Sequence, residues 1–372
     1  MRILFTAVPA YGHLLPLLPL ARAAHAAGDD VLVSTHATLA GTAAGLPFTP
    51  SGSALPDLLA ETTRRREGRL TLSHTDFGEI IEFFVDTRLD LDLASVHAVA
   101  EAHRPDLIVG DVVDFVAPMV AAELGVPWAA LNMSIALLPP VVQGFAEALE
   151  RQYQARGLPP VPRVALVDAW PAFLQPDGVT APADALPIRP QPHHVPTDQP
   201  FTPRFPGRED RPTVLFTFGT VANDAQVQRS ALDSVLDQDV NVIVTLPYET
   251  DPSTVDMPRD RVLPVGFVPL AGLLPHASLV VSAGGAGSVL AALASALPLV
   301  LLPQVTDQPM IAERVAAIGA GIVTEKPEDV GTAVGLALGD ERYRRAAAQA
   351  ADRLNATPAP AAVRDELATR IA

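Results

Sequence analysis

Cysteine is absent from the 372-residue sequence, and lysine occurs once, at Lys326, among 26 basic residues. The missing thiols exclude disulfides, zinc thiolates, iron–sulfur clusters and cysteine nucleophiles, and their absence fits a cytoplasmic protein. Because proline follows Lys326, the chain contains no Gly-Lys-Ser/Thr phosphate loop. Any phosphate would therefore be held without a lysine.

Long apolar runs and excess basic charge are also missing. The apolar residues 3–10 are interrupted by Pro9, Gly12 and His13, too early for a secretion signal, and no charge-poor run is long enough to span a bilayer. The 42 acidic residues outnumber the basic ones and give a formal charge of −16. Such a surface repels nucleic acid and anionic membranes, so we expect neither as a partner.

Buried-strand and helix patterns alternate along both halves of the chain. In the first half we predict strands at residues 2–8, 31–34, 105–111 and 126–131, and helices at residues 14–27, 93–102 and 116–124. In the second half we predict strands at residues 213–220, 240–246, 261–265, 278–281 and 299–302, and helices at residues 289–296, 340–354 and 361–371. This alternation predicts an α/β protein with two Rossmann-like domains facing across a cleft.

The domain boundaries follow from length and proline content. A chain of 372 residues exceeds what one core usually serves, and 49% apolar residues are ample for two. Periodicity fades and prolines crowd between residues 157 and 212. We therefore predict a first domain at residues 1–195, a linker at residues 196–212 and a second domain at residues 213–355, followed by a terminal helical segment at residues 356–372.

A glycine-rich turn follows the predicted strand at residues 278–281. Residues 284–288, Gly-Gly-Ala-Gly-Ser, lead into a helix, and a helix amino terminus with open N–H groups binds phosphate. The next strand brings Asp307 and Gln308 to the same sheet edge, where a carboxylate beside an amide suits sugar hydroxyls. Taken alone, the glycines fit many strand–helix turns, and Asp307 also fits a helix cap.

His13 lies where the first strand meets the first helix, at the sheet edge where ligands gather in open α/β sheets. A helix amino terminus disfavours imidazolium, so the ring can accept a proton if a partner fixes its tautomer. Asp111, beyond another strand of the same domain, is our preferred partner, and Asp114 is the alternative. A histidine at such a junction is also often a cap or a buried hydrogen-bonding residue.

Together these segments resemble the family 1 glycosyltransferases, especially actinobacterial enzymes that glycosylate antibiotics, which have the GT-B fold. The Gly-His-x-x-Pro motif of the family is matched by Gly12, His13 and Pro16, and its partner carboxylate falls on Asp111. By the resemblance the first domain binds the acceptor and the second the donor, and the terminal helix crosses back to the first domain. The sequence departs from the family at Ala283, where a histidine usually precedes the glycines.

The resemblance also assigns residues to the donor. Phe267 takes the place of the residue that stacks on the base, although a core position is its alternative, and Val268 pairs with the base through its backbone. The residues assigned to the pyrophosphate are Ser282, Gly284, Gly285, Ala286, Gly287 and Ser288, with Ser282 as a further hydroxyl. The residues assigned to the sugar are Asp307 and Gln308. Gly219 and Thr220 fit either the phosphate edge or an ordinary strand-ending turn.

Acceptor contacts are less defined, because most aromatic residues of the first domain also fit a core. The candidates are Tyr11, Gly12, Phe77, Phe84, Met133 and Phe145.

The function implied is inverting transfer of a sugar to an apolar natural-product aglycone, with His13 as base, Asp111 as its partner and no metal or other cofactor. The resemblance favours a dTDP-sugar, carrying a deoxysugar, over a UDP-sugar. The alternative, motivated by Ala283, is a catalytically silent homologue that binds an acceptor or a partner enzyme. A dinucleotide oxidoreductase is disfavoured because no Gly-x-Gly-x-x-Gly turn follows the first strand. Whether two copies pair as a homodimer stays open.

Overall fold

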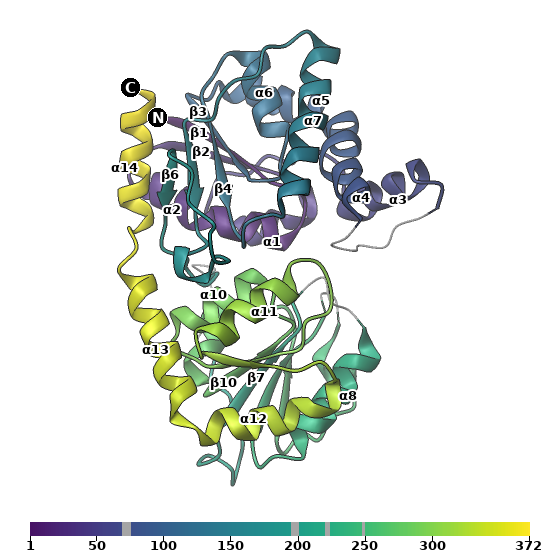
Figure 1. The fold of residues 1–372 in the computed structure, drawn as a ribbon, viewed down its shortest axis with the longest axis vertical. Coiled ribbons are helices and arrows are strands. Elements are labelled where there is room, and N and C mark those ends of the chain that lie inside the picture. Colours follow the sequence, from purple (N-terminus) through teal and green to yellow (C-terminus); the bar gives the residue numbers. More distant parts are fainter. Residues whose placement is uncertain (69–75, 195–200, 220–223, 248–249) are drawn as a thin grey trace. The chain divides into compact units, whose positions relative to one another are not determined.

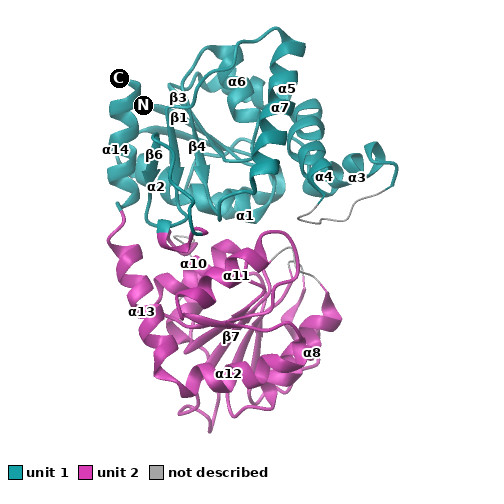
Figure 2. Cartoon of the chain, viewed as in Figure 1, with its two compact units in different colours: residues 1–172, 177–189, 358–372 teal, residues 173–176, 190–357 magenta. Residues whose placement is uncertain are grey.

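The computed structural model of the chain describes residues 1–68, 76–194, 201–219, 224–247 and 250–372 (Figure 1). These residues form two compact units (Figure 2). Unit 1 comprises residues 1–172, 177–189 and 358–372, and unit 2 comprises residues 173–176 and 190–357. Of the segment predicted as a linker, residues 196–200 lie outside the described residues, and residues 201–212 group with unit 2.

Six described strands of unit 1 form one parallel sheet in the order β2-β1-β3-β4-β5-β6. Their bounds are β1 Arg2–Thr6, β2 Asp30–Ser34, β3 Leu107–Asp111, β4 Trp128–Asn132, β5 Ala165–Asp168 and β6 Ala185–Pro187. Alternate residues of β1 enter different cores: Ile3 and Phe5 join one buried cluster and Leu4 joins another. Both faces of the sheet are therefore covered, as a parallel sheet requires.

The helices of unit 1 supply the two covering layers. Their bounds are α1 Tyr11–Leu14, η1 Leu15–Leu17, α2 Leu18–Ala26, η2 Ala37–Ala43, α3 Leu55–Arg65, α4 Phe77–Ile81, η3 Glu82–Thr87, α5 Arg88–His103, α6 Val116–Leu124, α7 Pro139–Arg156 and α14 Pro360–Ile371, with η4 (Ala172–Leu174) at the boundary of the units. The predicted helices at residues 14–27, 93–102 and 116–124 are confirmed, although the second of them begins earlier, at Arg88.

A π-helical turn, η3, joins α4 and α5, so that the three run on from Phe77 to His103. The extra residue of a π-helical turn changes the register of everything that follows it on the helix, and such turns are frequent at functional sites. Here the turn carries Phe84, and Arg88 follows it directly.

Unit 2 repeats the same architecture. Six of its described strands form a parallel sheet in the order β12-β11-β10-β7-β8-β9. The strand bounds are β7 Thr213–Thr217, β8 Asn241–Thr245, β9 Val262–Val265, β10 Leu279–Ser282, β11 Leu299–Leu301 and β12 Gly321–Val323. The helix bounds are α8 Ala225–Leu236, η5 Pro252–Thr254, α9 Leu270–Leu273, η6 Leu274–His276, α10 Ala286–Ala294, α11 Gln308–Ala317, η7 Pro327–Asp329, α12 Val330–Gly339 and α13 Glu341–Asn355.

The last two helices belong to different units. Helix α13 packs against α10 in unit 2, whereas α14 packs against α2 in unit 1 (Figure 1). An ion pair fixes α14: Nε of Arg364 lies 2.6 Å from Oδ2 of the buried Asp29. Arg370 also donates to the carbonyls of Val164 and Asp184 at 3.1 and 3.0 Å. The chain therefore returns to its first unit through specific polar contacts.

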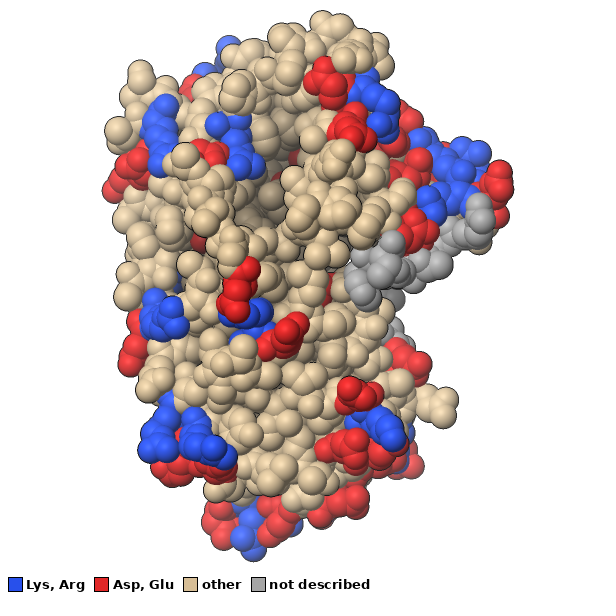
Figure 3. All heavy atoms as spheres, in the orientation of Figure 1, with Lys and Arg blue, Asp and Glu red and all other residues tan. Residues whose placement is uncertain are grey.

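Charged side chains of both signs are intermixed on the face of the molecule shown in Figure 3. Within the described residues, every helix is too short or too polar to cross a membrane.

Candidate active site

The candidate base lies at the point where the strand order of unit 1 reverses. The chain passes from β1 to β2 on one side and then to β3 on the other side of β1. Loops that leave adjacent strands in opposite directions open a crevice at the carboxyl ends of those strands, and ligands bind there in open α/β sheets. His13 follows β1 and Asp111 ends β3. The topology therefore brings residues 98 positions apart to one place.

The pair is formed by direct contact. Nδ1 of His13 lies 3.2 Å from Oδ1 of Asp111. Asp111 is 1% exposed, whereas the His13 side chain keeps 22% of its surface exposed. The carboxylate is held by backbone donors, since Val8 N–H donates to Oδ2 and Val113 N–H donates to Oδ1, both at 3.0 Å. The orientation of Asp111 is thus fixed by the segments that follow β1 and β3.

The electrostatics of Asp111 favour a charged carboxylate. Burial acts to raise its pKa, because removing the carboxylate from water penalises the ionised form. The charge and hydrogen bond of His13, with the backbone N–H groups of Val8 and Val113, act in the opposite direction and hold the pKa below its ordinary value. Asp111 is therefore an ionised partner for the imidazole.

Asp114, the alternative partner, faces Arg88. Nη2 of Arg88 lies 3.4 Å from Oδ1 of Asp114. Burial and the neighbouring charge of Asp111 raise the pKa of Asp114, while the Arg88 charge opposes this. Arg88 also pairs with Asp92, and all three residues are at most 2% exposed. Sequence reasoning missed Arg88 and Asp92, although their spacing of four places them on one helix face.

The acceptor candidates separate into distinct environments. The ring of Phe84 lies 5.7 Å from that of His13 and 6.3 Å from that of Phe145, centroid to centroid. Phe84 is partly exposed, whereas Phe145 is 5% exposed in the same core cluster. Phe84 and Phe145 therefore form an aromatic wall beside the base.

The other four acceptor candidates have different surroundings. Phe77 packs on the same cluster as Phe145, while Tyr11 and Met133 pack on the cluster that lies against α2 and α14. Gly12 is exposed, and a Cβ atom there would meet nothing within 4 Å. Gly12 therefore leaves open space beside His13.

The glycine-rich loop of unit 2 lies at the equivalent reversal of strand order. Strand β7 leads to β8 on one side, and the later β10 pairs on its other side. Gly219 is exposed just beyond β7, with φ +71°, and the loop at Ala283–Gly285 follows β10. Thr220 lies outside the described residues. The N-cap residue of α10 is Gly285, and no side chain caps this helix.

The loop depends on Gly284, which has φ +90°. A Cβ atom there would lie 3.3 Å from the Gln308 carbonyl oxygen, so only glycine fits without strain. Its N–H donates to Oγ of Ser282 at 3.1 Å, and Ser282 is 1% exposed. Ser282 thus shapes the loop from below. Ala283, also 1% exposed, packs into the core of the unit.

Asp307 and Gln308 lie beside this loop. Asp307 is the N-cap residue of α11 but makes no capping hydrogen bond with its side chain, which accepts from Oγ1 of Thr306 at 3.1 Å. Thr306 has φ +56°, a strained conformation for a β-branched residue. Oε1 of Gln308 accepts from the N–H groups of Gln304 and Val305 at 2.8 and 3.0 Å. The side-chain oxygen of Gln308 therefore fixes the Gln304–Val305 segment.

The base-binding candidates follow β9. Phe267 is 39% exposed, and Val268 is partly exposed beside it. This exposure argues against the alternative that Phe267 is a core residue, and an exposed aromatic ring is suited to stacking on a nucleotide base.

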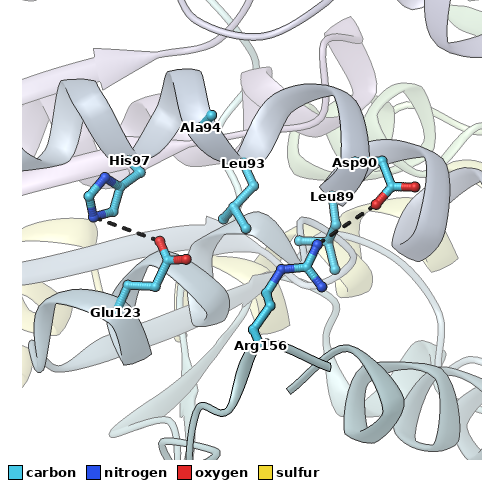
Figure 4. Close-up of a pocket in the computed structure, with 7 residues that line it drawn as sticks. All are labelled: Leu89, Asp90, Leu93, Ala94, His97, Glu123 and Arg156. Carbon is cyan, nitrogen blue, oxygen red and sulfur yellow. Dashed lines mark ion pairs between the residues drawn. The ribbon is translucent and has the colours of Figure 1, made fainter. Parts of the chain in front are cut away.

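A separate open cavity of about 510 Å³ lies on unit 1 between α5, α6 and α7 (Figure 4). Two ion pairs cross it: His97 to Glu123 and Arg156 to Asp90, each at 3.7 Å. None of the predicted site residues lines it. In the described part of the chain, no group of three or more His, Cys, Asp or Glu side chains is arranged to hold a metal ion.

A solved glycosyltransferase structure has the same fold as this chain. A solved structure of the Streptomyces sp. SF2575 glycosyltransferase SsfS6, complexed with thymidine diphosphate, superposes with a TM-score of 0.82 at 25% identity, covering 99% of each chain. The predicted GT-B fold is confirmed, and it defines the class of this protein.

Sequence relatives are consistent with this class. L-demethylnoviosyl transferase of Streptomyces niveus is 29% identical over 99% of this chain and 98% of its own length. Elloramycin glycosyltransferase ElmGT of Streptomyces olivaceus is 30% identical, over 99% and 97%. The model of the erythromycin biosynthesis protein CIII-like C-terminal domain matches residues 229–369. The chain belongs to the family of actinobacterial antibiotic glycosyltransferases and is a nucleotide-sugar-dependent glycosyltransferase.

Proposed function

We propose that this enzyme transfers a deoxysugar with inversion from a dTDP-sugar to an apolar natural-product aglycone, and that His13 is its general base. The observation that carries the proposal is the 3.2 Å contact between Nδ1 of His13 and the buried Asp111 carboxylate. A base needs a fixed tautomer, and an ionised carboxylate at Nδ1 fixes the proton on that nitrogen.

The chemistry follows from this tautomer. With Nδ1–H donating to Asp111, Nε2 is the basic nitrogen. It takes the proton of an acceptor hydroxyl as that oxygen forms a bond to the anomeric carbon, and the bond from this carbon to the phosphate oxygen breaks. The nucleoside diphosphate leaves with the bonding electrons, and the imidazolium formed is stabilised by the Asp111 charge.

Burial of the nearby carboxylates supports a single displacement. A double displacement needs a nucleophile that reaches the anomeric carbon. Asp111 and Asp114 are each 1% exposed and are held by backbone donors or by Arg88. Neither can approach a sugar without leaving its partners. A single displacement inverts the configuration of the anomeric carbon.

The donor is proposed to bind unit 2 at the loop after β10. The N–H groups that begin α10 and the positive end of that helix would hold the pyrophosphate without the histidine that Ala283 replaces, with Ser288 as hydroxyl donor. Gly219 and Thr220 are proposed at the phosphate edge of this site. Phe267 would stack on the base.

The rest of the donor follows from neighbouring positions. Val268 is proposed to pair with the base through its backbone. The carboxylate of Asp307 and the amide nitrogen of Gln308 would bind the sugar hydroxyls. SsfS6 binds thymidine diphosphate, and this supports dTDP over UDP as the carrier.

Two measurements test the proposal. Calorimetric titration with dTDP and UDP should give micromolar binding with dTDP the tighter ligand. Mass-spectrometric assay of dTDP-sugars with a panel of apolar aglycones should then detect glycosides, and His13→Ala should abolish them while keeping dTDP affinity. His25→Ala, at an exposed position in α2, is the matched control.

The outcomes separate the alternatives. Unchanged turnover by His13→Ala would show that the base is another residue. Nucleotide binding without turnover by the unaltered chain on any acceptor would instead favour a silent, acceptor-binding role.

A further inference from the structure

Arg88 is a buried guanidinium that the proposed chemistry does not use. It is 2% exposed, and Nη2 donates to the Ala7 carbonyl oxygen at 3.1 Å and to Oδ1 of Asp114 at 3.4 Å. Its Nη1 pairs with Asp92 on the next turn of the helix. A buried arginine with carboxylate and carbonyl partners on other elements restricts all of those elements at once.

Both backbone segments that hold Asp111 are tied to this one guanidinium. Ala7 precedes Val8, whose N–H donates to Oδ2 of Asp111 at 3.0 Å. The N–H of Asp114 donates to the Asp111 carbonyl oxygen at 3.0 Å and closes the turn after β3. Arg88 bonds to the first segment through the Ala7 oxygen and to the second through the Asp114 carboxylate.

Charge balance gives Arg88 a second effect. Asp92, Asp111 and Asp114 are all at most 1% exposed; Arg88 pairs with Asp92 and Asp114, and a protonated His13 pairs with Asp111. An unpaired buried carboxylate is costly and tends to take a proton or move. Removing Arg88 would therefore loosen the turn that carries Asp111.

The helix register links this network to the acceptor side of His13. Phe84, Arg88 and Asp92 are spaced by four residues along η3 and α5. Phe84 contacts the His13 ring, and Arg88 bonds to Asp114 in the turn that follows Asp111. Oδ1 of Asp92 accepts from both the N–H and Oγ of Ser53 at 2.7 Å. One helix face thus touches the imidazole and supports its carboxylate.

We propose that Arg88 is a positioning residue for His13: by tying the Ala7–Val8 and Asp111–Asp114 segments together, it holds the Asp111 carboxylate where it fixes the His13 tautomer. The inference rests on the proposed function, because it takes His13 to be the base. It adds to the proposed site a residue of another helix, α5, which acts on Asp111 through these two backbone segments.

The first test reads the imidazole itself and needs no substrate. In the ¹⁵N-histidine NMR spectrum of the full chain, the His13 signals are identified by their loss in His13→Gln. At a pH high enough to deprotonate the ring, the unaltered protein should show the remaining proton on Nδ1. Arg88→Met should shift the ring toward the Nε2-protonated tautomer, and Arg88→Lys should shift it less, because an ammonium keeps the charge but not the fork of donors. An unchanged tautomer in either folded variant overturns the proposal.

The second test reads turnover. Arg88→Met should lower kcat by about 10- to 100-fold, the cost of a misplaced catalytic group, with dTDP affinity unchanged. The effects of Arg88→Met and Asp111→Asn should be strongly non-additive, because both act on one carboxylate. Simple addition of the two effects would show that Arg88 acts on the fold alone and would overturn the proposal.

Control variants distinguish failure of the Arg88 proposal from failure of the proposed function on which it rests. Ser53→Ala perturbs the far side of the same network and should leave both the tautomer and kcat unchanged. If Arg88→Met fails to fold, Arg88→Lys and Asp114→Asn carry both readouts. If His13→Ala retains turnover, the proposed function fails, and the NMR experiment still decides whether Arg88 controls the His13–Asp111 contact.

Discussion

Replacement of Asp111 by asparagine removes the charge behind the proposed base while keeping its shape. In the structure, Oδ1 of Asp111 lies 3.2 Å from Nδ1 of His13. At that separation and an effective dielectric constant of ~20, the attraction between the carboxylate and an imidazolium is about 5 kcal/mol. Because part of it is screened through the exposed face of His13, this is an upper limit on the transition-state stabilisation that Asp111→Asn removes.

The corresponding loss of rate is large. A barrier increase of about 5 kcal/mol lowers kcat by nearly 10⁴-fold. General-base catalysis as a whole contributes at least about 10²-fold. We therefore expect kcat of Asp111→Asn to fall between about 10²- and 10⁴-fold, with the affinity for dTDP unchanged because the proposed donor residues lie in unit 2.

The same substitution has a cost in stability. The amide nitrogen of asparagine must replace one carboxylate oxygen, and each oxygen accepts a backbone N–H, from Val8 or Val113. One donor would then face another donor, which costs about 1–3 kcal/mol. Chemical denaturation measures this loss, and steady-state assays at saturating substrates measure kcat. A folded Asp111→Asn enzyme whose kcat falls by less than about 10-fold would refute the reasoning.

Two further predictions concern stability. Gly284→Ala should destabilise the protein by about 1–2 kcal/mol and weaken dTDP binding, because φ is +90° and the new Cβ meets the Gln308 carbonyl. The control, Gly285→Ala, should keep the stability of the unaltered protein, because φ is −61° and a Cβ atom there has nothing within 4 Å. Equal unfolding midpoints for the two variants would contradict this prediction. Burial raises the pKa of Asp168 despite a hydrogen bond from Asn132, so its ionisation opposes folding above its ordinary pKa of about 4. Asp168→Asn should therefore increase the unfolding free energy at pH 7 and not at pH 3, and a decrease at pH 7 measured in urea would show that the charge is favourable.

Much of the fold could be predicted because its signals are local. The buried run at β3 and the helix at α6 are apolar over consecutive residues, and Gly125 ends α6 in the left-handed conformation that glycine adopts readily. Strands β5 and β6 were not predicted. They are short, lie in a proline-rich segment, and depend on pairing with β4 and with each other, which no local pattern records.

The candidate site shows the same division. The residue types and their order along the chain were sufficient to single out His13, the glycine loop and the pair Asp307 and Gln308. The sequence and the family motif also favoured Asp111 over Asp114, but Asp114 stayed open as the alternative because the two stand only three residues apart at the end of β3. Their contacts separate them: Asp111 lies against His13 and Asp114 against Arg88.

The sequence by itself determined the alternation of strands and helices, the family, and which residues stand at the ends of strands, because each is written in neighbouring residues. The tertiary structure decided which carboxylate supports the imidazole and that Arg88 lies behind both. The Asp111 contacts join residues about 100 positions apart, and Arg88 bonds to residues 81 and 26 positions away; these contacts exist only once parallel strands have brought their carboxyl ends to one edge. Distance along the chain therefore separates what could be predicted from what had to be seen.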